Sequence, residues 1–156
     1  MSSVTIGNAV PAFTAQSTQG EITQNNFLSQ WTVLYFYPKD STPGCTTQAQ
    51  NFRDQLENFK AANCQIIGVS RDSLKSHDNF TGKQSLPFAL VSDPDETLCT
   101  LFDVMKMKNM YGKQVRGVER STFLIDPKGV LVKEWRGLRV PGHVDQVLQA
   151  VTEAAR

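Results

Sequence analysis

Hydrophobic residues in this chain alternate between short continuous runs and stripes at helical spacing. Residues 31–37 (WTVLYFY) are nearly all apolar and β-favouring, which predicts a central strand covered on both faces. After this strand, Cys45 shares a helical stripe with four apolar positions. Those positions are Ala49, Phe52, Leu56 and Phe59. The spacing predicts a helix whose first turn directs Cys45 toward the body of the protein.

The rest of the pattern continues this alternation of strands and helices. The segments are strands at 65–70 and 88–91, helices at 73–84 and around 98–102, a hairpin of 120–125 with 130–135, and a closing amphipathic helix around 144–151. Their order predicts an α/β fold with a mixed central sheet and helices on both faces. In such sheets a ligand site lies at the carboxyl ends of the strands, and Cys45 follows the first buried strand directly.

The composition fits an ordinary globular domain. The chain has 156 residues, and a single domain over residues 4–156 is expected. Sixteen basic and fifteen acidic residues give a charge of +1, so neither nucleic acid nor a strongly charged partner is indicated. The apolar runs are too short for a membrane span, and the first eight residues lack the pattern of a secretory signal. A cytoplasmic protein without membrane contact is therefore expected.

The segment PKDSTPGC, residues 38–45, provides the surroundings that a reactive thiol needs. It places Cys45 at a helix N-terminus, where unpaired N–H groups and the helix dipole favour the thiolate. Gly44 lets the backbone approach a ligand without a Cβ in the way, and Thr42 can place a hydroxyl beside the sulfur. Pro38 adds an apolar wall that limits water. The segment predicts a cysteine nucleophile.

Other charged and metal-binding residue types add one candidate to this site. Arg120 begins a predicted strand, and its guanidinium could stabilise a thiolate and grip an oxygen substrate. Arg53 is expected on the surface or in an ion pair. His77 and His143 have no cysteine or carboxylate cluster at metal-ligand spacing, so packing or capping roles are expected and no metal is predicted. The methionines in the stretch 105–110 are expected to pack within a loop.

The chain resembles a known family. The pattern Pro38-x-x-x-Thr42-x-x-Cys45 matches the signature of peroxiredoxins, which are thiol peroxidases of thioredoxin-like fold. The surrounding sequence is similar to the bacterioferritin comigratory protein, or peroxiredoxin Q, subgroup. The matching segments are YFYPKD at 35–40, TPGCT at 42–46, GVSRDS at 68–73, SH at 76–77, LPF at 86–88, SD at 92–93, MYG at 110–112, RSTFLID at 120–126 and GH at 142–143. The resemblance runs in order over about residues 4 to 150.

The resemblance implies a hydroperoxide reductase that requires neither a metal nor an organic cofactor. The Cys45 thiolate would attack one peroxide oxygen and become a sulfenic acid while water or an alcohol leaves. Thr42, the amides of Gly44 and Cys45, and Arg120 would hold the oxygens and stabilise the leaving one. A thiol such as thioredoxin, glutaredoxin or glutathione would then reduce the sulfenic acid. The subgroup also favours a monomer or a weak dimer.

The chain departs from the subgroup at the second, resolving cysteine. Members carry that cysteine five or about thirty-six residues after the first, and Gln50 and Thr81 occupy these positions here. The other two cysteines, Cys64 and Cys99, are expected to be buried side chains. A one-cysteine mechanism is therefore predicted, in which an external thiol attacks oxidised Cys45. A two-cysteine peroxidase that uses Cys99 or Cys64 is the alternative.

Two further functions compete with peroxide reduction. A thioredoxin-type disulfide reductase needs a Cys-x-x-Cys pair, and Thr42 stands where its first cysteine would be. A peroxide sensor that passes oxidation to a protein partner would use the same Cys45, and the missing partner cysteine would give it a longer-lived sulfenic acid. Oxidation for a single turnover, without cycling under any thiol, would favour the sensor.

Overall fold

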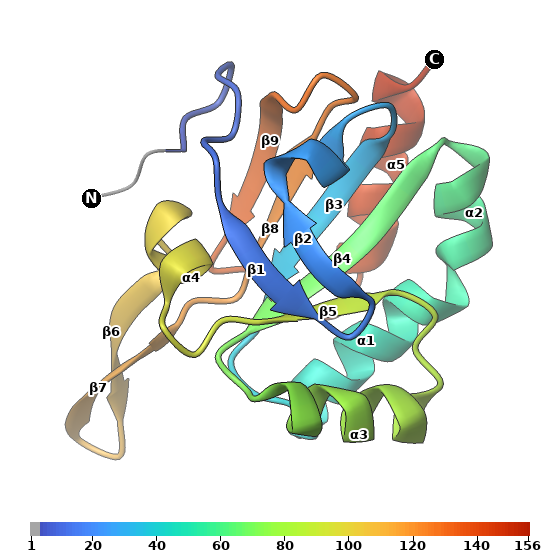
Figure 1. The fold of residues 1–156 in the computed structure, drawn as a ribbon. Coiled ribbons are helices and arrows are strands. Elements are labelled where there is room, and N and C mark those ends of the chain that lie inside the picture. Colours follow the sequence, from blue (N-terminus) through green and yellow to red (C-terminus); the bar gives the residue numbers. More distant parts are fainter. Residues whose placement is uncertain (1–3) are drawn as a thin grey trace.

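A computed structural model describes residues 4–156 (Figure 1). Residues 1–3 belong to the stretch in which a secretory signal is predicted to be missing, and they lie outside the described residues. The elements are β1 (Thr14–Ser17), β2 (Gly20–Thr23), the 3₁₀ helix η1 (Gln24–Phe27), β3 (Trp31–Phe36), α1 (Pro43–Asp54), α2 (Leu56–Ala61), β4 (Cys64–Ser70), α3 (Leu74–Gln84), β5 (Ala89–Ser92), α4 (Thr97–Leu101), β6 (Met105–Met110), β7 (Lys113–Val118), β8 (Ser121–Ile125), β9 (Leu131–Arg136) and α5 (His143–Ala154).

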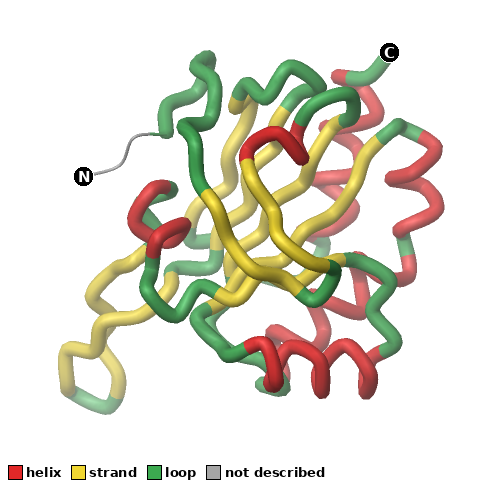
Figure 2. The backbone as a smooth tube through the Cα atoms, in the orientation of Figure 1, coloured by secondary structure: helices red, strands yellow, loops and turns green. Residues whose placement is uncertain are grey.

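Seven strands form one mixed sheet in the order β2-β1-β5-β4-β3-β8-β9 (Figure 2). The central strands β3, β4 and β5 run parallel. Beside β3, β8 runs antiparallel to it, and β9 at the edge runs antiparallel to β8. The strand predicted from residues 31–37 is β3, which lies in the interior of this sheet between β4 and β8 and is buried over nearly its whole length. The predicted α/β architecture is confirmed.

Helices cover both faces of the sheet, as predicted. On one face the core contains residues of α1, α2, α3 and α5, together with the side chains that β3 and β4 direct toward them. On the other face α4 and η1 pack against the opposite side chains of the same strands. Gly68 in β4 lets the ring of Tyr35 lie against the first of these faces, because a Cβ there would come within 2.9 Å of that ring. Within residues 4–156, no helix has the length and apolar character needed to cross a bilayer.

The helix after Cys45 differs from the prediction because it is two helices. The chain leaves helical geometry at Gln55, where α1 ends and α2 begins. The apolar stripe continues across the break, since Leu56 and Phe59 of α2 enter the same core as Phe52 of α1. The apolar periodicity predicts the shared buried face correctly. It does not show that the helix is interrupted at Gln55.

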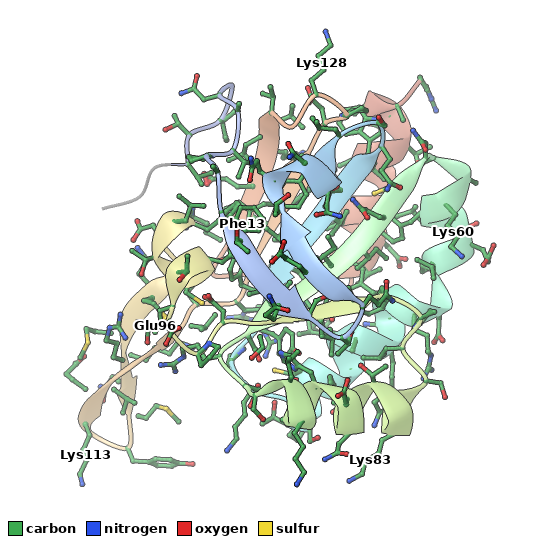
Figure 3. All side chains as sticks on the ribbon, viewed as in Figure 1. Phe13, Lys60, Lys83, Glu96, Lys113 and Lys128 are labelled. Atoms are coloured by element: carbon green, nitrogen blue, oxygen red, sulfur yellow. The ribbon has the colours of Figure 1, made fainter. Side chains whose placement is uncertain are left out.

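Two hairpins were not predicted. Strands β1 and β2 form one of them at an edge of the sheet, and β6 and β7 form a separate two-stranded unit where a packed loop was expected. Figure 3 shows Lys113 extending from the outer end of β6–β7, while Glu96 near its base pairs with Arg116 at 2.6 Å. Met105 and Met107 alternate with lysines in β6, but most side chains of this hairpin are exposed, so the short alternation does not mark a buried face. Tyr111 and Gly112 have the positive φ angles of a tight hairpin turn.

Candidate active site

Cys45 lies at the carboxyl-terminal end of β3, in the first turn of α1. Thr42 is the residue before the helix, Pro43 its first residue and Cys45 its third. The first helical hydrogen bond runs from the Thr46 amide to the Thr42 carbonyl at 2.9 Å. The amides of Gly44 and Cys45 come before that bond and therefore have no acceptor within the helix. Cys45 is only 2% exposed, so a bulky reductant cannot reach its sulfur in this conformation.

Arg120 reaches this thiol from the neighbouring strand. It directly precedes β8, whose Ser121 pairs with Phe36 at the end of β3, and this pairing brings the two segments together. The Arg120 Nη2 donates to the Cys45 Sγ at 3.4 Å. A Cβ on Gly44 would lie 3.3 Å from the same nitrogen, which is tighter than ordinary van der Waals contact. Glycine at position 44 therefore leaves room for the guanidinium as well as for a ligand.

Gln48 is a third residue of the site, beside Cys45 and Arg120, and the sequence did not predict it. It lies one turn beyond Cys45 on α1, is fully buried, and accepts a 2.7 Å hydrogen bond from the Arg120 Nη1 through its Oε1. Its Nε2 has no hydrogen-bond partner among the described residues. A polar residue three positions after the cysteine, on the buried face of the helix, was the signal available in the sequence. The bond fixes one arm of the guanidinium while the other faces the sulfur.

Thr42 and Pro38 frame the loop before the helix. The Thr42 hydroxyl donates to the Lys39 carbonyl at 2.8 Å, and no bond from it to the Cys45 sulfur occurs in the described part of the chain. Because its proton is committed to Lys39, the Thr42 oxygen is left to accept a hydrogen bond from a ligand. Pro38 follows β3 and is half-buried. Contacts thus join Cys45, Gly44 and Arg120 directly, while Thr42 and Pro38 shape the approach to them.

The other two cysteines lie far from Cys45 in the fold. Cys64 pairs with Trp31 at the start of β3, whereas Cys45 follows the end of that strand, and the two ends of β3 lie about 17 Å apart at about 3.3 Å per residue. Cys99 lies in α4 and packs in the core on the opposite face of the sheet. Burial raises the pKa of Cys64 to about 12, and burial followed by the nearby Asp93 carboxylate raises the pKa of Cys99 well above its usual value. Both thiols are free, as is Cys45.

The two histidines lie in different surroundings. His143 begins α5, where its Nε2 lies 2.8 Å from the Thr122 hydroxyl. Burial, and then the positive charge of Arg120, lower the pKa of His143 to about 4, so this ring is neutral at pH 7. His77 instead faces two carboxylates, Asp40 and Asp72, and the potential ligand atoms of the three residues lie within 4.8 Å of one another.

The His77 cluster corrects the expectation that this histidine has no carboxylate cluster around it. The two aspartates come from separate loops, 37 residues before and 5 residues before His77, so sequence spacing did not reveal the group. The His77 nitrogens and both Asp40 oxygens already have hydrogen-bond partners from the protein. The cluster is therefore satisfied by protein hydrogen bonds.

Comparison with known proteins agrees with this geometry. The sequence profile of the AhpC/TSA family matches residues 6–134. The chain is 60% identical over 126 residues to peroxiredoxin Bcp of Xanthomonas campestris pv. campestris, covering 81% of this chain and 79% of that protein. It is 45% identical over 151 residues to peroxiredoxin Bcp of Bacillus subtilis, covering 96% of each.

Solved structures show the same fold. Peroxiredoxin Q of Xanthomonas campestris superposes with a TM-score of 0.90 at 50% identity, over 99% of each chain. A cysteine-to-serine mutant of Xylella fastidiosa PrxQ gives a TM-score of 0.92 at 43% identity over the whole of both chains. The Xanthomonas campestris bacterioferritin comigratory protein, solved to explain its alkyl peroxide reduction activity, gives 0.90 at 49% identity over the whole of both chains.

Proposed function

The chain belongs to the AhpC/TSA family as a peroxiredoxin of the Bcp type, a thiol-dependent peroxidase, and we propose that it reduces hydrogen peroxide and organic hydroperoxides through Cys45. One observation carries the assignment of the residue: the Arg120 guanidinium lies 3.4 Å from the Cys45 sulfur at the N-terminus of α1. A cation and a helix terminus at one thiol favour its thiolate. The alkyl peroxide reduction of the Xanthomonas relative supports organic hydroperoxides as substrates.

The reaction needs only groups that the site already holds. The Cys45 thiolate attacks the terminal oxygen of the hydroperoxide, an S–O bond forms, and the O–O bond breaks. The departing alkoxide or hydroxide takes a proton and leaves as alcohol or water, and Cys45 becomes a sulfenic acid. Arg120 and the amides of Gly44 and Cys45 donate to the oxygen on which charge develops, and Thr42 accepts from the peroxide hydroxyl. We assign Pro38 the role of limiting water at the approach.

We propose that an external thiol, and no second cysteine of the chain, reduces the sulfenic acid. Xanthomonas peroxiredoxin Q has been solved as serine mutants of two cysteines that lie 36 residues apart in its own sequence, and that spacing from Cys45 leads here to Thr81. At the other usual position, Gln50 donates to the side chain of Gln84 at 2.8 Å. The positions of Cys64 and Cys99 described above also disfavour a disulfide with Cys45, since the Cα atoms of a disulfide lie within about 7 Å.

The reductant must gain access to a buried sulfur. Thioredoxin, glutaredoxin or glutathione is larger than a peroxide and must reach the sulfur of a residue that is 2% exposed. Local opening at the start of α1 is therefore part of the proposed cycle. The proposal further includes a single domain over residues 4–156, a monomer or weak dimer, and a cytoplasmic location where thiol reductants are available.

A peroxide sensor is the second candidate. It is favoured by one observation, which is that neither Cys64 nor Cys99 lies near enough to Cys45 to consume its sulfenic acid quickly. A long-lived sulfenic acid could pass its oxidation to a cysteine of a partner protein. The two functions differ in turnover, because a peroxidase cycles with a small or protein thiol and a sensor is oxidised once.

Steady-state turnover distinguishes these functions. We expect the protein to consume many equivalents of hydrogen peroxide or cumene hydroperoxide per chain with at least one of thioredoxin, glutaredoxin plus glutathione, or glutathione alone. The measurement follows peroxide loss and NADPH oxidation in parallel, with each reductant system lacking the protein as the blank. Consumption of one equivalent per chain under every reductant would contradict the peroxidase and favour the sensor.

A further inference from the structure

Asp40, in the loop between β3 and α1, binds three side chains from two other parts of the molecule. Its Oδ1 accepts a 2.6 Å hydrogen bond from the Tyr37 hydroxyl, at the end of β3. Its Oδ2 accepts a 2.8 Å bond from the Ser76 hydroxyl and lies 2.7 Å from the His77 Nδ1, both on α3. Asp40 and His77 are both buried. The active-site loop is thereby fastened to the first turn of α3.

The contact between His77 and Asp40 contains one proton more than a neutral imidazole and a carboxylate would supply. The His77 Nε2 lies 2.9 Å from the Val91 carbonyl, which can only accept, so Nε2 carries a hydrogen. The Nδ1 faces a carboxylate oxygen that also only accepts, so a second proton must lie between Nδ1 and Asp40. Burial alone would raise the pKa of Asp40, but hydrogen bonds from His77 and then Tyr37 outweigh it and lower that pKa. Acceptors at both ring nitrogens, and hydroxyl donors to both oxygens of Asp40, favour an ionised carboxylate with the proton on the imidazole.

The groups around the pair favour the same charge state. The Asp72 Oδ2 accepts from the Asp40 amide at 2.9 Å and from the Ser70 hydroxyl at 2.6 Å, so a second carboxylate borders the site. Burial, before any other cause, raises the pKa of Tyr37 well above its usual value, which keeps this phenol neutral. The phenol of Tyr35, further along β3, is likewise neutral for the same reason. One buried carboxylate, Asp40, and one half-buried carboxylate, Asp72, therefore face one cation, and removal of that cation would leave them uncompensated.

A short chain of contacts leads from this pair to the reacting sulfur. Asp40 is bound at its side chain by His77 and at its amide by Asp72, which fixes the Asp40 side of the Lys39–Asp40 peptide. The Lys39 carbonyl accepts the Thr42 hydroxyl, and the Thr42 carbonyl accepts the first helical amide of α1. Movement of Asp40 would therefore displace Thr42 and the start of the helix that carries Cys45.

We propose that His77 is held as an imidazolium by Asp40 and acts as a positioning residue, fixing the loop that orients Thr42 and Cys45 toward peroxide. This inference rests on the proposed function only where it concerns rate. The charge of His77 can be tested without any substrate.

The charge is read directly from the side-chain ¹⁵N spectrum of the wild-type protein, which contains two histidines. At pH 7 we expect both His77 nitrogens to show the shifts of protonated nitrogens, while His143 shows one protonated and one unprotonated nitrogen. An unprotonated His77 nitrogen at pH 7 would overturn the proposal, whatever the enzymatic activity. A His143→Asn variant assigns the two rings.

The positioning role is read from the two half-reactions, measured separately by rapid mixing. We expect His77→Ala and Asp40→Ala to slow the oxidation of Cys45 by peroxide at least about tenfold, because displacement of a reacting group by about 1 Å can cost about a hundredfold. Reduction of the sulfenic acid by thiol should not slow, since a loosened loop exposes the sulfur. Asp40→Asn can donate to a neutral His77, so we expect it to react at least about threefold faster than Asp40→Ala and to change the His77 spectrum to the neutral form.

Exposed Asp78, next to His77 on α3, provides a matched control in Asp78→Asn, which should change neither half-reaction. Wild-type oxidation rates in His77→Ala, or equal slowing of both half-reactions, would overturn the positioning role. If an alanine variant does not fold, the wild-type spectrum and the comparison of Asp40→Asn with wild type decide the question. If wild-type Cys45 itself does not react with peroxide, the proposed function fails, while the spectrum still tests the charge of His77.

Discussion

Cys45→Ser is expected to reduce peroxide turnover to the uncatalysed background. A serine hydroxyl at this position would stay protonated at neutral pH, and its oxygen cannot accept the peroxide oxygen as a sulfur can. The buried environment is otherwise unchanged, since one oxygen replaces one sulfur. The measurement is peroxide consumption with the best reductant, together with the intact mass after exposure to one equivalent of peroxide. The mass of Cys45→Ser should not increase by one oxygen at residue 45.

The matched controls are Cys64→Ala and Cys99→Ala, which remove the other two thiols one at a time. Both side chains are buried in the core, so these variants should lose some stability and keep their turnover at temperatures where they are folded. Turnover by Cys45→Ser at an appreciable fraction of the wild-type rate would contradict the assignment of the nucleophile. Loss of turnover in folded Cys64→Ala or Cys99→Ala would point to a second redox cysteine.

Arg120→Met should produce the second largest loss, lowering the rate of Cys45 oxidation by about a hundredfold to a thousandfold. The guanidinium donates to the sulfur and to Gln48, and its removal takes away the cation nearest the reacting atoms. Loss of one such donor from a preorganised site costs about 2.7–4 kcal/mol in the barrier. Arg120→Lys keeps the charge without the two-pronged geometry and should lose less. Stopped-flow oxidation by hydrogen peroxide measures all three proteins.

Arg139→Met is a suitable control for this effect, because Arg139 is an exposed arginine of the segment before α5. It should react at the wild-type rate. An Arg120→Met protein that is folded and reacts as fast as wild type would show that the helix terminus alone activates Cys45. Equal losses in Arg120→Met and Arg139→Met would indicate a general effect of net charge.

The parts of the site that lie close together in the sequence could be predicted from it. The run from Pro38 to Cys45 contains a strand end, a turn and a helix start, and each of these has a local chemical signature. Arg120 is distant in the chain, and only its place at the start of a predicted strand and the family resemblance indicate it. The antiparallel pairing of β8 with β3 explains why a residue at that place reaches the sulfur.

The contacts that the sequence did not predict are those that depend on packing between separate elements. Gln48 is unremarkable among the polar residues of α1 until the position of Arg120 is known. The Asp40–His77 pair joins a loop to a helix that begins more than thirty residues later, and only the fold brings them together. The β6–β7 hairpin is not evident for another reason: it buries little, and the short alternation of methionine and lysine in β6 lies in a polar stretch that resembles a loop.

We propose that Cys45 works as the only redox cysteine of the chain. A non-reducing peptide mass map tests this most directly. The wild-type protein is treated with one equivalent of hydrogen peroxide without reductant, and sulfenic acid is trapped with dimedone before digestion. We expect the dimedone adduct on the Cys45 peptide, with the Cys64 and Cys99 peptides recovered as free thiols. A disulfide linking Cys45 to Cys64 or Cys99 would contradict the claim.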